Sequence, residues 1–316
     1  MKRVSGEFEI IEHKELPGLK VFFVNMQYRS AHAHSDFECC LLLDGYVHIT
    51  AGGQTIMLSP GDFVPLRPCL AHEIRAGGKG ALLLAIQIRP SLLRGWSSEN
   101  SLDFAFISAK SCMSVNELSE FNSRALELAR CYIERCDGWE FGCMGSAGLL
   151  LRDLTAHFPK CGAAAGRDNR RQARMMRILR FVEDNCTRKL LLSEIARSEG
   201  VTVSYLSHFF RDNFHISFQE YLSSLRCERA RTLLADRGRT LLDISVECGF
   251  SDVKYFNRAF SERFGRSPRE YRAGMTQGPG ENARDPEQEF LSEERSLRLL
   301  DSVSYTHLTL PTILRV

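Results

Sequence analysis

The spacing of hydrophobic residues changes along the chain and divides it into a strand-rich part and a helical part. Over the first ninety residues, short apolar segments rich in β-branched and aromatic residues alternate with Gly and Pro turns at a spacing of about ten residues. This pattern is typical of strands in a small antiparallel barrel or sandwich. The predicted strands are residues 19–26, 38–43, 46–50, 55–58, 62–66 and 81–88.

After Pro90 the period becomes helical. Helices are predicted over residues 116–133 and from about 141 to 158. Residues 162–168 are small and polar, which is typical of a linker. From residue 170 to residue 272 the pattern is helical almost throughout, with turns at Gly200, Gly238 and Gly249.

The composition is that of a globular protein, with 44% hydrophobic and 25% charged residues among 316. That length allows two or three domains. No segment approaches the roughly 18 uninterrupted apolar residues of a membrane span, and the first twenty residues lack the apolar core of a secretory signal. The eleven cysteines are an odd number without two-residue metal or redox spacing, so we expect reduced thiols in the cytoplasm.

Charge is distributed unevenly. Residues 170–272 hold 20 Lys and Arg against 13 Asp and Glu, a balance of +7, whereas the rest of the chain has a balance of −5. Such a split favours a module that faces nucleic acid, attached to a part with another role.

The basic part contains an internal repeat. Residues 192–214 and 241–264 each combine a short helical segment, a Gly turn and a second helical segment. Gly200 and Gly249 match at an offset of 49, and after one inserted residue the later matches follow at an offset of 50. This is the helix-turn-helix plan, in which glycine ends the first helix because the chain there needs a positive φ.

Capping residues begin the second helix of each copy: Thr202 in the first, and Ser251 or Asp252 in the second. Residues 218–234 between the copies predict one amphipathic helix. It is long enough to space two recognition helices by roughly one turn of DNA, about 34 Å.

These segments resemble the AraC/XylS family of transcription regulators. The resemblance is carried by Ser204–Ser207 with Phe209–Arg211, by Cys248–Asp252 with Tyr255–Phe260, and by Phe264–Arg272. It covers about residues 170–272 and implies that the second helices enter successive major-groove segments on one face of double-stranded DNA. The alternative is a helical bundle without DNA affinity, which the duplicated unit disfavours.

By this resemblance, the residues that contact bases are Ser204, Ser207 and His208 in the first unit and Lys254, Tyr255, Asn257 and Arg258 in the second. Arg258 can bond guanine bidentately and Asn257 can bond adenine, each giving roughly 1–3 kcal/mol of discrimination. The smaller side chains of the first unit predict looser sequence choice there. The expected phosphate contacts are Arg211, Arg266, Arg269 and Arg272.

Four residues of the strand-rich part form a candidate ligand set. His32, His34 and Glu38 share one face by strand alternation, and His72 follows on a neighbouring strand. Their nitrogen and oxygen atoms suit a divalent metal. The spacing resembles the first motif of the cupin family, and Pro60–Asp62 fits the turn before the second, but the second motif is shortened to Pro68-x-x-x-His72.

Two uses of these residues stay open. Regulatory cupins attached to such DNA-binding domains usually keep the shell as a small-molecule pocket, so we favour pocket or packing histidines and expect no cofactor. A divalent metal held by the same set is the alternative. The predicted effector pocket comprises His32, His34, Glu38, Tyr46, Arg67 and His72. A cation such as Arg67 at its mouth would select an acidic or sugar-like effector.

An apolar stripe marks the first predicted helix. It consists of Leu118, Phe121, Ala125, Leu128 and Tyr132. In the resembled family such helices pair two chains, and packing against the chain's own barrel is the equal alternative.

We therefore expect an α+β protein of two domains: an N-terminal antiparallel β-barrel, cupin-like, with accessory helices, and a C-terminal all-α pair of helix-turn-helix units. The predicted boundaries are 1–110 for the effector-sensing barrel, 111–160 for a helical dimerisation or packing segment, 161–169 for the linker, 170–274 for the DNA-binding domain and 275–316 for a tail. The tail has a disordered composition, and its last fifteen or so residues resemble a read-through peptide from sequencing adapters.

The predicted function is that of a cytoplasmic, non-enzymatic transcription regulator. Its partners are double-stranded DNA, a carbohydrate or small-acid effector bound in the barrel, and a second copy of the chain; the resemblance also allows contact with RNA polymerase. One alternative is a metal-dependent cupin enzyme that carries a DNA-binding appendage. Another is a constitutive regulator whose barrel only dimerises.

Overall fold

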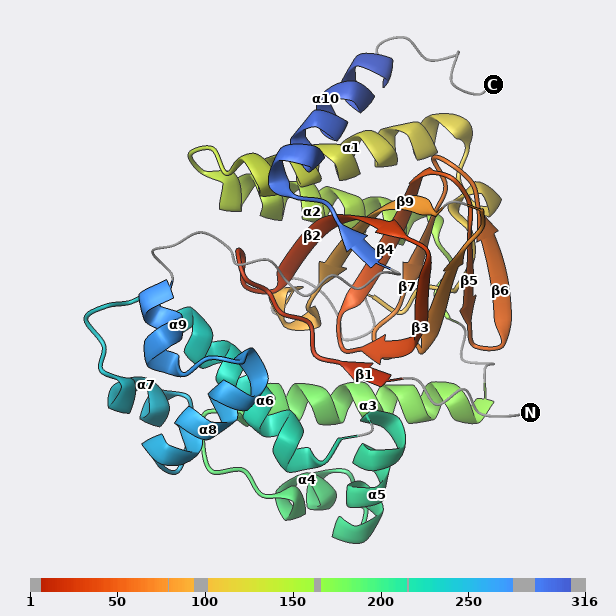
Figure 1. The fold of residues 1–316 in the computed structure, drawn as a ribbon. Helices are drawn as coiled ribbons and strands as arrows, with labels where there is room; N and C mark the ends of the chain where they lie inside the picture. The colour runs from red at the N-terminus through yellow and green to blue at the C-terminus, as the bar shows by residue number, and fades with distance from the viewer. Residues whose placement is uncertain are drawn as a thin grey trace.

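A computed structural model describes residues 7–78, 80–93, 102–161, 166–214, 216–274 and 288–307. A domain of two sheets and two long helices lies beside a smaller all-helical domain (Figure 1). The strands are β1 (Glu7–Glu9), β2 (Leu19–Met26), β3 (Tyr28–His34), β4 (Phe37–Asp44), β5 (Val47–Ala51), β6 (Gln54–Leu58), β7 (Phe63–Leu66), β8 (His72–Ala76), β9 (Ala81–Ile88) and β10 (Gln288–Phe290). The helices are α1 (Val115–Glu134), α2 (Trp139–His157), α3 (Gly166–Asn185), α4 (Leu192–Ser198), α5 (Val203–Phe214), α6 (Phe218–Leu233), α7 (Leu241–Glu247), α8 (Val253–Phe264), α9 (Pro268–Gly274) and α10 (Glu293–His307), with short 3-10 turns at Pro90–Leu93 and Ala109–Ser111.

The strands form two five-stranded sheets, in the orders β1-β3-β8-β5-β6 and β10-β2-β9-β4-β7. Pairing is antiparallel except between β1 and β3. No ladder joins the two sheets in the described part of the chain, so of the barrel and the sandwich that the pattern allowed, the domain is the sandwich. Apolar side chains from both sheets, rather than a closed ring of hydrogen bonds, hold the sandwich together.

The second sheet is covered on both faces. Strand β9 is buried along nearly its whole length because one face meets the other sheet and the opposite face meets α1 and α2. Phe63 of β7 stacks on Phe121 of α1 with ring centroids 3.9 Å apart. The adjacent Cys39 and Cys40 of β4 belong to these two different cores.

The apolar stripe of α1 packs against the chain's own sandwich. Phe121, Ala125 and Leu128 are fully buried, and Tyr132 is 6% exposed; all four belong to the core formed with the second sheet. Between the two predicted alternatives, the structure therefore decides for internal packing of this face.

Helix α6 joins the two helix-turn-helix units, α4–α5 and α7–α8. Its first half, including Tyr221 and Leu222, enters the core of the first unit, and its second half, including Cys227 and Ala230, enters the core of the second. The two units are therefore parts of one packed domain.

The turn of the second unit contacts the segment between α3 and α4. Arg226 donates to the carbonyl oxygens of Cys186 at 2.7 Å and Arg188 at 2.8 Å. Gly249 (φ +82°) lies so close that a Cβ atom there would be 2.5 Å from the carbonyl oxygen of Thr187. Gly200, the equivalent residue of the first unit, also has a positive φ, but a Cβ atom there would contact nothing within 4 Å.

Two predicted boundaries differ from the structure. Helix α3 begins at Gly166, inside the expected linker 161–169, of which residues 162–165 lie outside the described part. Within the tail, β10 pairs with β2 and α10 packs on α1 (Figure 1). Leu300 is 1% exposed, so burial of apolar surface orders residues 288–307, which the composition alone did not reveal; residues 275–287 and 308–316 are outside the described part.

Among the described residues, every helix is too short or too polar to serve as a membrane span.

The two turn glycines give a matched stability test. Gly249→Ala should lower the free energy of unfolding by about 3 kcal/mol, because a left-handed alanine costs about 1 kcal/mol and the collision with Thr187 about 2 kcal/mol more. Gly200→Ala should cost only the first amount. Urea denaturation followed by circular dichroism measures both, and equal midpoints for the two variants would contradict the close contact.

Candidate nucleic-acid interface and ligand site

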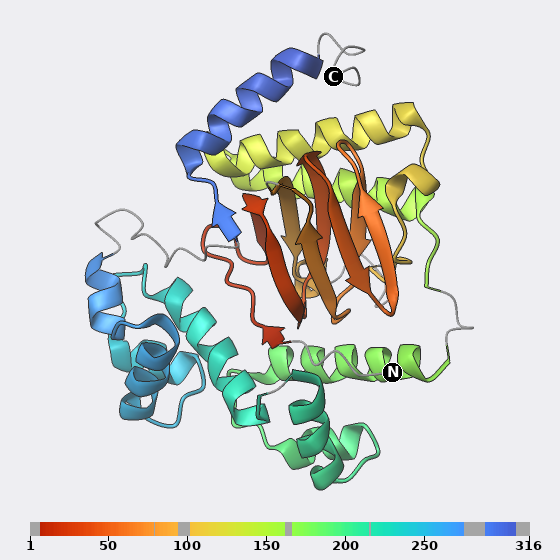
Figure 2. The ribbon, with the colours of Figure 1, turned by 45° about the vertical axis from the view of Figure 1, so that its right-hand side comes forward.

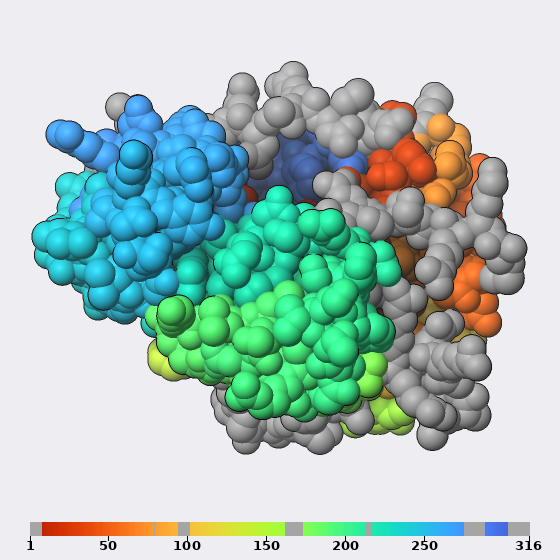
Figure 3. Space-filling model, turned by 90° about the horizontal axis from the view of Figure 1, so that it is seen from below, coloured from red at the N-terminus to blue at the C-terminus, as the bar shows by residue number. Residues whose placement is uncertain are grey.

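The two recognition helices, α5 and α8, are capped as the sequence predicted. Thr202 Oγ1 accepts from the backbone N–H of Tyr205 at 3.1 Å, and the Asp252 carboxylate accepts from that of Tyr255 at 2.6 Å. The second cap is therefore Asp252 rather than Ser251. Both units belong to the face seen in Figure 3, the first coloured green and the second blue.

Most predicted base-contacting residues are accessible. Ser204, His208, Lys254 and Arg258 are exposed, and Ser207, Tyr255 and Asn257 are half-buried. Tyr255 also packs edge-on against Phe250 at 5.9 Å, and the Arg258 guanidinium lies 5.3 Å from the centre of the Tyr255 ring. Tyr255 thus supports the recognition helix as well as lying on it.

The predicted phosphate-contacting residues divide into two groups. Arg211, Arg266 and Arg269 are exposed. Arg272 is half-buried, and its Nε and Nη2 atoms are buried without hydrogen-bond partners. The structure therefore leaves three of the four arginines fully accessible to a DNA backbone.

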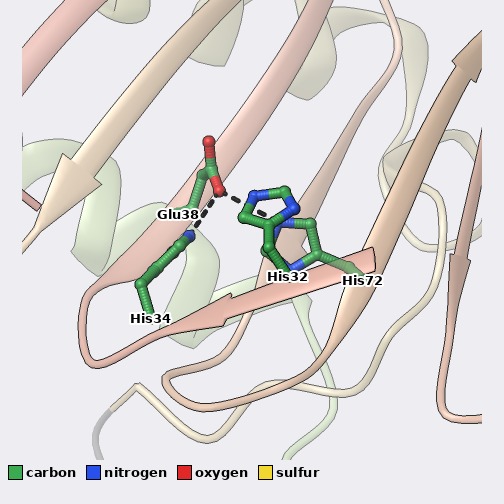
Figure 4. A group of neighbouring side chains, drawn as sticks. All are labelled: His32, His34, Glu38 and His72. Atoms are coloured by element: carbon green, nitrogen blue, oxygen red, sulfur yellow. Dashed lines mark hydrogen bonds and ion pairs between the residues drawn. The ribbon is translucent and has the colours of Figure 1, made fainter. Parts of the chain in front are cut away.

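The four predicted ligand residues form one cluster inside the sandwich (Figure 4). His32 on β3 is paired with His72 on β8 in the first sheet, while Glu38 lies on β4 in the second. His34 Nε2 is 2.8 Å and His72 Nε2 is 3.4 Å from Glu38 Oε2. All four residues are at most 5% exposed, so the cluster is a buried polar link between the sheets.

Backbone carbonyls orient the three imidazole rings. The Nδ1 atoms of His32, His34 and His72 lie 2.9, 3.0 and 2.9 Å from the carbonyl oxygens of Ser30, Asp36 and Leu70. Each carbonyl needs a proton on Nδ1, so Nε2 is the ring atom that would bind a metal ion. His34 Nε2 carries a proton in its hydrogen bond to Glu38 and would have to release it. His72 Nε2 is buried without a hydrogen-bond partner.

Burial and charge set the protonation of the cluster. Burial, with the neighbouring His72, lowers the pKa of His32 to about 2. Burial also disfavours the charged form of His34, but its hydrogen bond to Glu38 raises the pKa of His34 overall. Burial alone would raise the pKa of Glu38, yet the hydrogen bond with His34 and the nearby His72 ring hold it well below the usual value.

The donor set fits a divalent metal ion. One ligand atom from each of the four residues lies within 4.8 Å of all the others. Once His34 releases its Nε2 proton, three neutral imidazole nitrogens and one carboxylate oxygen suit zinc, iron, nickel or manganese. The unpartnered His72 Nε2 is the atom that such an ion would satisfy.

A cavity of about 250 Å³ lies in the sandwich next to the cluster. Of the six predicted pocket residues, His32 and Glu38 line it directly, and His34 and His72 contact Glu38. Tyr46 and Arg67 do not line it: Tyr46 is exposed beside Gly77, and Arg67 lies 3.3 Å from Asp103.

Several residues that line the cavity were not predicted. They include Lys20, Arg29, Gln87, Gln288 and Phe290. Gln87 had a signal, because it is the single polar residue in the apolar strand 81–88; its amide donates to Glu38 Oε1 at 3.3 Å. Gln288 and Phe290 had none, since the pairing of β10 with β2 is a tertiary contact.

Comparison with known proteins divides the chain in the same way. Residues 23–151 match the AraC-like ligand binding domain, and residues 195–274 match a helix-turn-helix domain. The chain is 32% identical over 128 residues to YijO, an uncharacterized HTH-type transcriptional regulator of Escherichia coli K12, across 40% of this chain and 45% of that protein. It therefore spans less than half the length of that relative.

A longer alignment joins both domains. The melibiose operon regulatory protein of Escherichia coli K12 is 20% identical over 263 residues, which cover 77% of this chain and 83% of that protein. A solved AraC-type regulator from Chromobacterium violaceum is 30% identical, with a TM-score of 0.32, over 34% of this chain and 96% of its own. With both matched domains in this order, the chain belongs to the AraC family of transcription regulators.

Proposed function

We propose that this protein binds operator DNA through α5 and α8 and alters transcription when a ligand occupies the sandwich. The observation that carries the proposal is the joining of two capped helix-turn-helix units by α6. A 16-residue helix rises about 24 Å, and the recognition helices lie toward its opposite ends (Figure 1). This arrangement suits successive major-groove segments about 34 Å apart.

The strand that carries the ligand site also contacts the DNA-binding domain. Ala33, between His32 and His34, packs in the core formed by α3 and α6. Cys69, near His72, donates a 2.7 Å hydrogen bond from its backbone N–H to the His34 carbonyl, and its Sγ lies 3.6 Å from Sδ of Met176 on α3. Helix α3 runs along this end of the sandwich (Figure 2). A ligand that shifts β3 therefore changes the interdomain contact. It can shift the equilibrium between two arrangements of the domains only by the difference in its affinity for them.

The effector best suited to the cavity is a small polar metabolite, either a carbohydrate or a small acid. Gln87 and Gln288 offer amide groups, and Lys20 and Arg29 offer positive charge, although Arg29 is paired with Glu9 at 2.9 Å. The four residues of the histidine cluster could also hold a divalent metal ion, which would supply a coordination site for an effector oxygen.

Helix α2 is the best candidate for pairing two copies of the chain. The stripe of α1 is buried, but Phe141 of α2 is 83% exposed and Leu149 is 42% exposed. Gly145 and Gly148, on the same exposed face, meet no atom within 4 Å at the Cβ position, so another helix could approach closely.

We propose no catalytic role, because the relatives are transcription regulators. Thiols that form no disulfide bond among the described residues support a cytoplasmic location. Contact with RNA polymerase stays part of the proposal.

Two arginines should separate base from phosphate contacts. Arg258→Ala should cost roughly 1–3 kcal/mol at the preferred operator and relax sequence choice. Arg269→Ala should weaken binding to all sequences alike and lower the salt slope by about one. Fluorescence anisotropy on selected genomic fragments and on competitor DNA measures both, and the same pattern for the two variants would contradict the assignment.

Metal binding can be tested without an effector. We expect the wild-type chain to retain about one Ni²⁺ or Zn²⁺ per chain after desalting, because three oriented imidazoles and a carboxylate meet. His34→Ala should lose it, whereas His48→Ala, on β5 and outside the cluster, should keep it. Elemental analysis and calorimetry provide the readout; equal metal content in the two variants would leave the cluster as packing only.

Pairing through α2 predicts a change of oligomeric state. Phe141→Glu should convert a dimer to a monomer in light scattering, because it removes roughly 2 kcal/mol of apolar burial from each copy and adds a charge. Leu242→Glu on α7, which is also exposed, is the control and should leave the dimer intact. A dimer that survives Phe141→Glu would place the interface elsewhere.

A further inference from the structure

The cavity inside the sandwich has a buried inner end and an accessible rim. His32, Glu38 and Cys40 are buried at the inner end. The lining residues that are half-buried or exposed form the rim: Glu9, Lys20, Phe22, Arg29, Gln288 and Phe290. The last two belong to β10, which lies outside both ranges that match known domains. A strand from the C-terminal segment therefore completes the wall of this cavity.

Two short strands, one from each sheet, contribute to the rim. Strand β1 is held in place, because Phe8 is 6% exposed and its ring lies 6.2 Å from that of Tyr221 on α6. Its neighbour Glu9 accepts a hydrogen bond from Arg29 at 2.9 Å. By contrast, none of the three residues of β10 is buried, and Phe290 is 51% exposed. Strand β10 is therefore the less tightly packed part of the rim.

Strand β10 pairs with β2 over a short length. The register joins three residue pairs, whereas β2 and β9 are joined at eight. Beyond the strand, the backbone N–H of Leu291 donates to the Phe23 carbonyl at 2.9 Å, and the ring of Phe290 lies 5.3 Å from that of Phe22. Segments with little burial open at a lower free energy than a core does, so β10 can leave while the β2–β9 ladder stays intact.

Helix α10 anchors the chain directly after β10. Leu300 is 1% exposed in the core formed with α1 and α2, and Arg135 pairs with Glu293 at 2.6 Å. On the other side, residues 275–287 connect the end of α9 to β10 along the chain. Strand β10 therefore lies between the DNA-binding domain and a helix that is fixed on the sandwich (Figure 2).

We propose that β10 is a movable wall of the sandwich cavity, and that a small molecule reaches His32 and Glu38 when β10 separates from β2. This inference rests on the proposed effector site inside the sandwich. In the closed position, Gln288 presents an amide group and Phe290 an aromatic ring to the molecule inside.

Two adjacent thiols of β4 give an internal readout. Cys40 lines the cavity, whereas Cys39 belongs to the core on the opposite face of the sheet. Burial raises the pKa of both thiols, so both react slowly while they are covered. Labelling of the full chain with iodoacetamide, followed by peptide mapping in a mass spectrometer, gives the two rates separately. In the wild-type chain, Cys40 should react at least fivefold faster than Cys39.

Three variants test the movement of β10. Phe290→Ala, which loses the contact with Phe22, should raise the Cys40 rate at least fivefold and leave the Cys39 rate unchanged. Leu291→Pro should have the same effect, because it removes the N–H that bonds to β2 without changing the lining of the cavity. Met57→Ala is the control and should change neither rate, since Met57 is 62% exposed on β6 and lies outside the cavity.

Four results would overturn the inference. Equal rates for Cys39 and Cys40 in the wild-type chain, or unchanged Cys40 rates in Phe290→Ala and Leu291→Pro, would mean that β10 does not open. A joint increase at Cys39 and Cys40 would mean that the whole sandwich opens. An increase in Phe290→Ala alone would mean that the smaller side chain leaves a hole. Labelling requires neither DNA nor an effector, so failure here is distinguishable from failure of the proposed function.

Discussion

The position of α6 constrains the whole molecule. Its two halves enter the cores of the two helix-turn-helix units, and the same helix contacts the N-terminal segment through the rings of Tyr221 and Phe8, 6.2 Å apart, and through Arg231 and the His13 carbonyl. Packed helices do not deform continuously. The spacing of the recognition helices therefore depends on the position at which the N-terminal domain contacts α6, and the reverse also holds.

The cluster of His32, His34, Glu38 and His72 is a second constraint on the structure. Buried polar groups are costly unless satisfied, and Glu38 is satisfied by residues of the opposite sheet. The strand that carries His32 and His34 presents Ala33 to α3 and α6. The polar link between the two sheets therefore lies one residue from the interdomain contact, so a ligand bound inside the sandwich lies close to the DNA-binding domain.

Much of the architecture was predictable from periodicity and spacing. The helix-turn-helix repeat was visible because its glycines and caps are local requirements: a positive φ at Gly200 and Gly249 and an oxygen before the first turn of each recognition helix. The cluster of His32, His34, Glu38 and His72 was also predictable, since strand alternation and hairpin pairing are short-range rules. Tyr46 and Arg67 were misplaced because the path of a loop or strand end follows from packing.

By itself, the sequence determined the order of the domains, the duplicated DNA-binding unit and the four residues of the buried cluster. Only the tertiary structure decided that the sheets form a sandwich, that the apolar stripe of α1 packs in the chain's own core, and that residues 288–307 return to β2 and α1. Hydrogen bonds and backbone angles within a few residues depend on the local sequence. The surface against which an apolar face packs depends instead on which apolar areas the folded chain brings together.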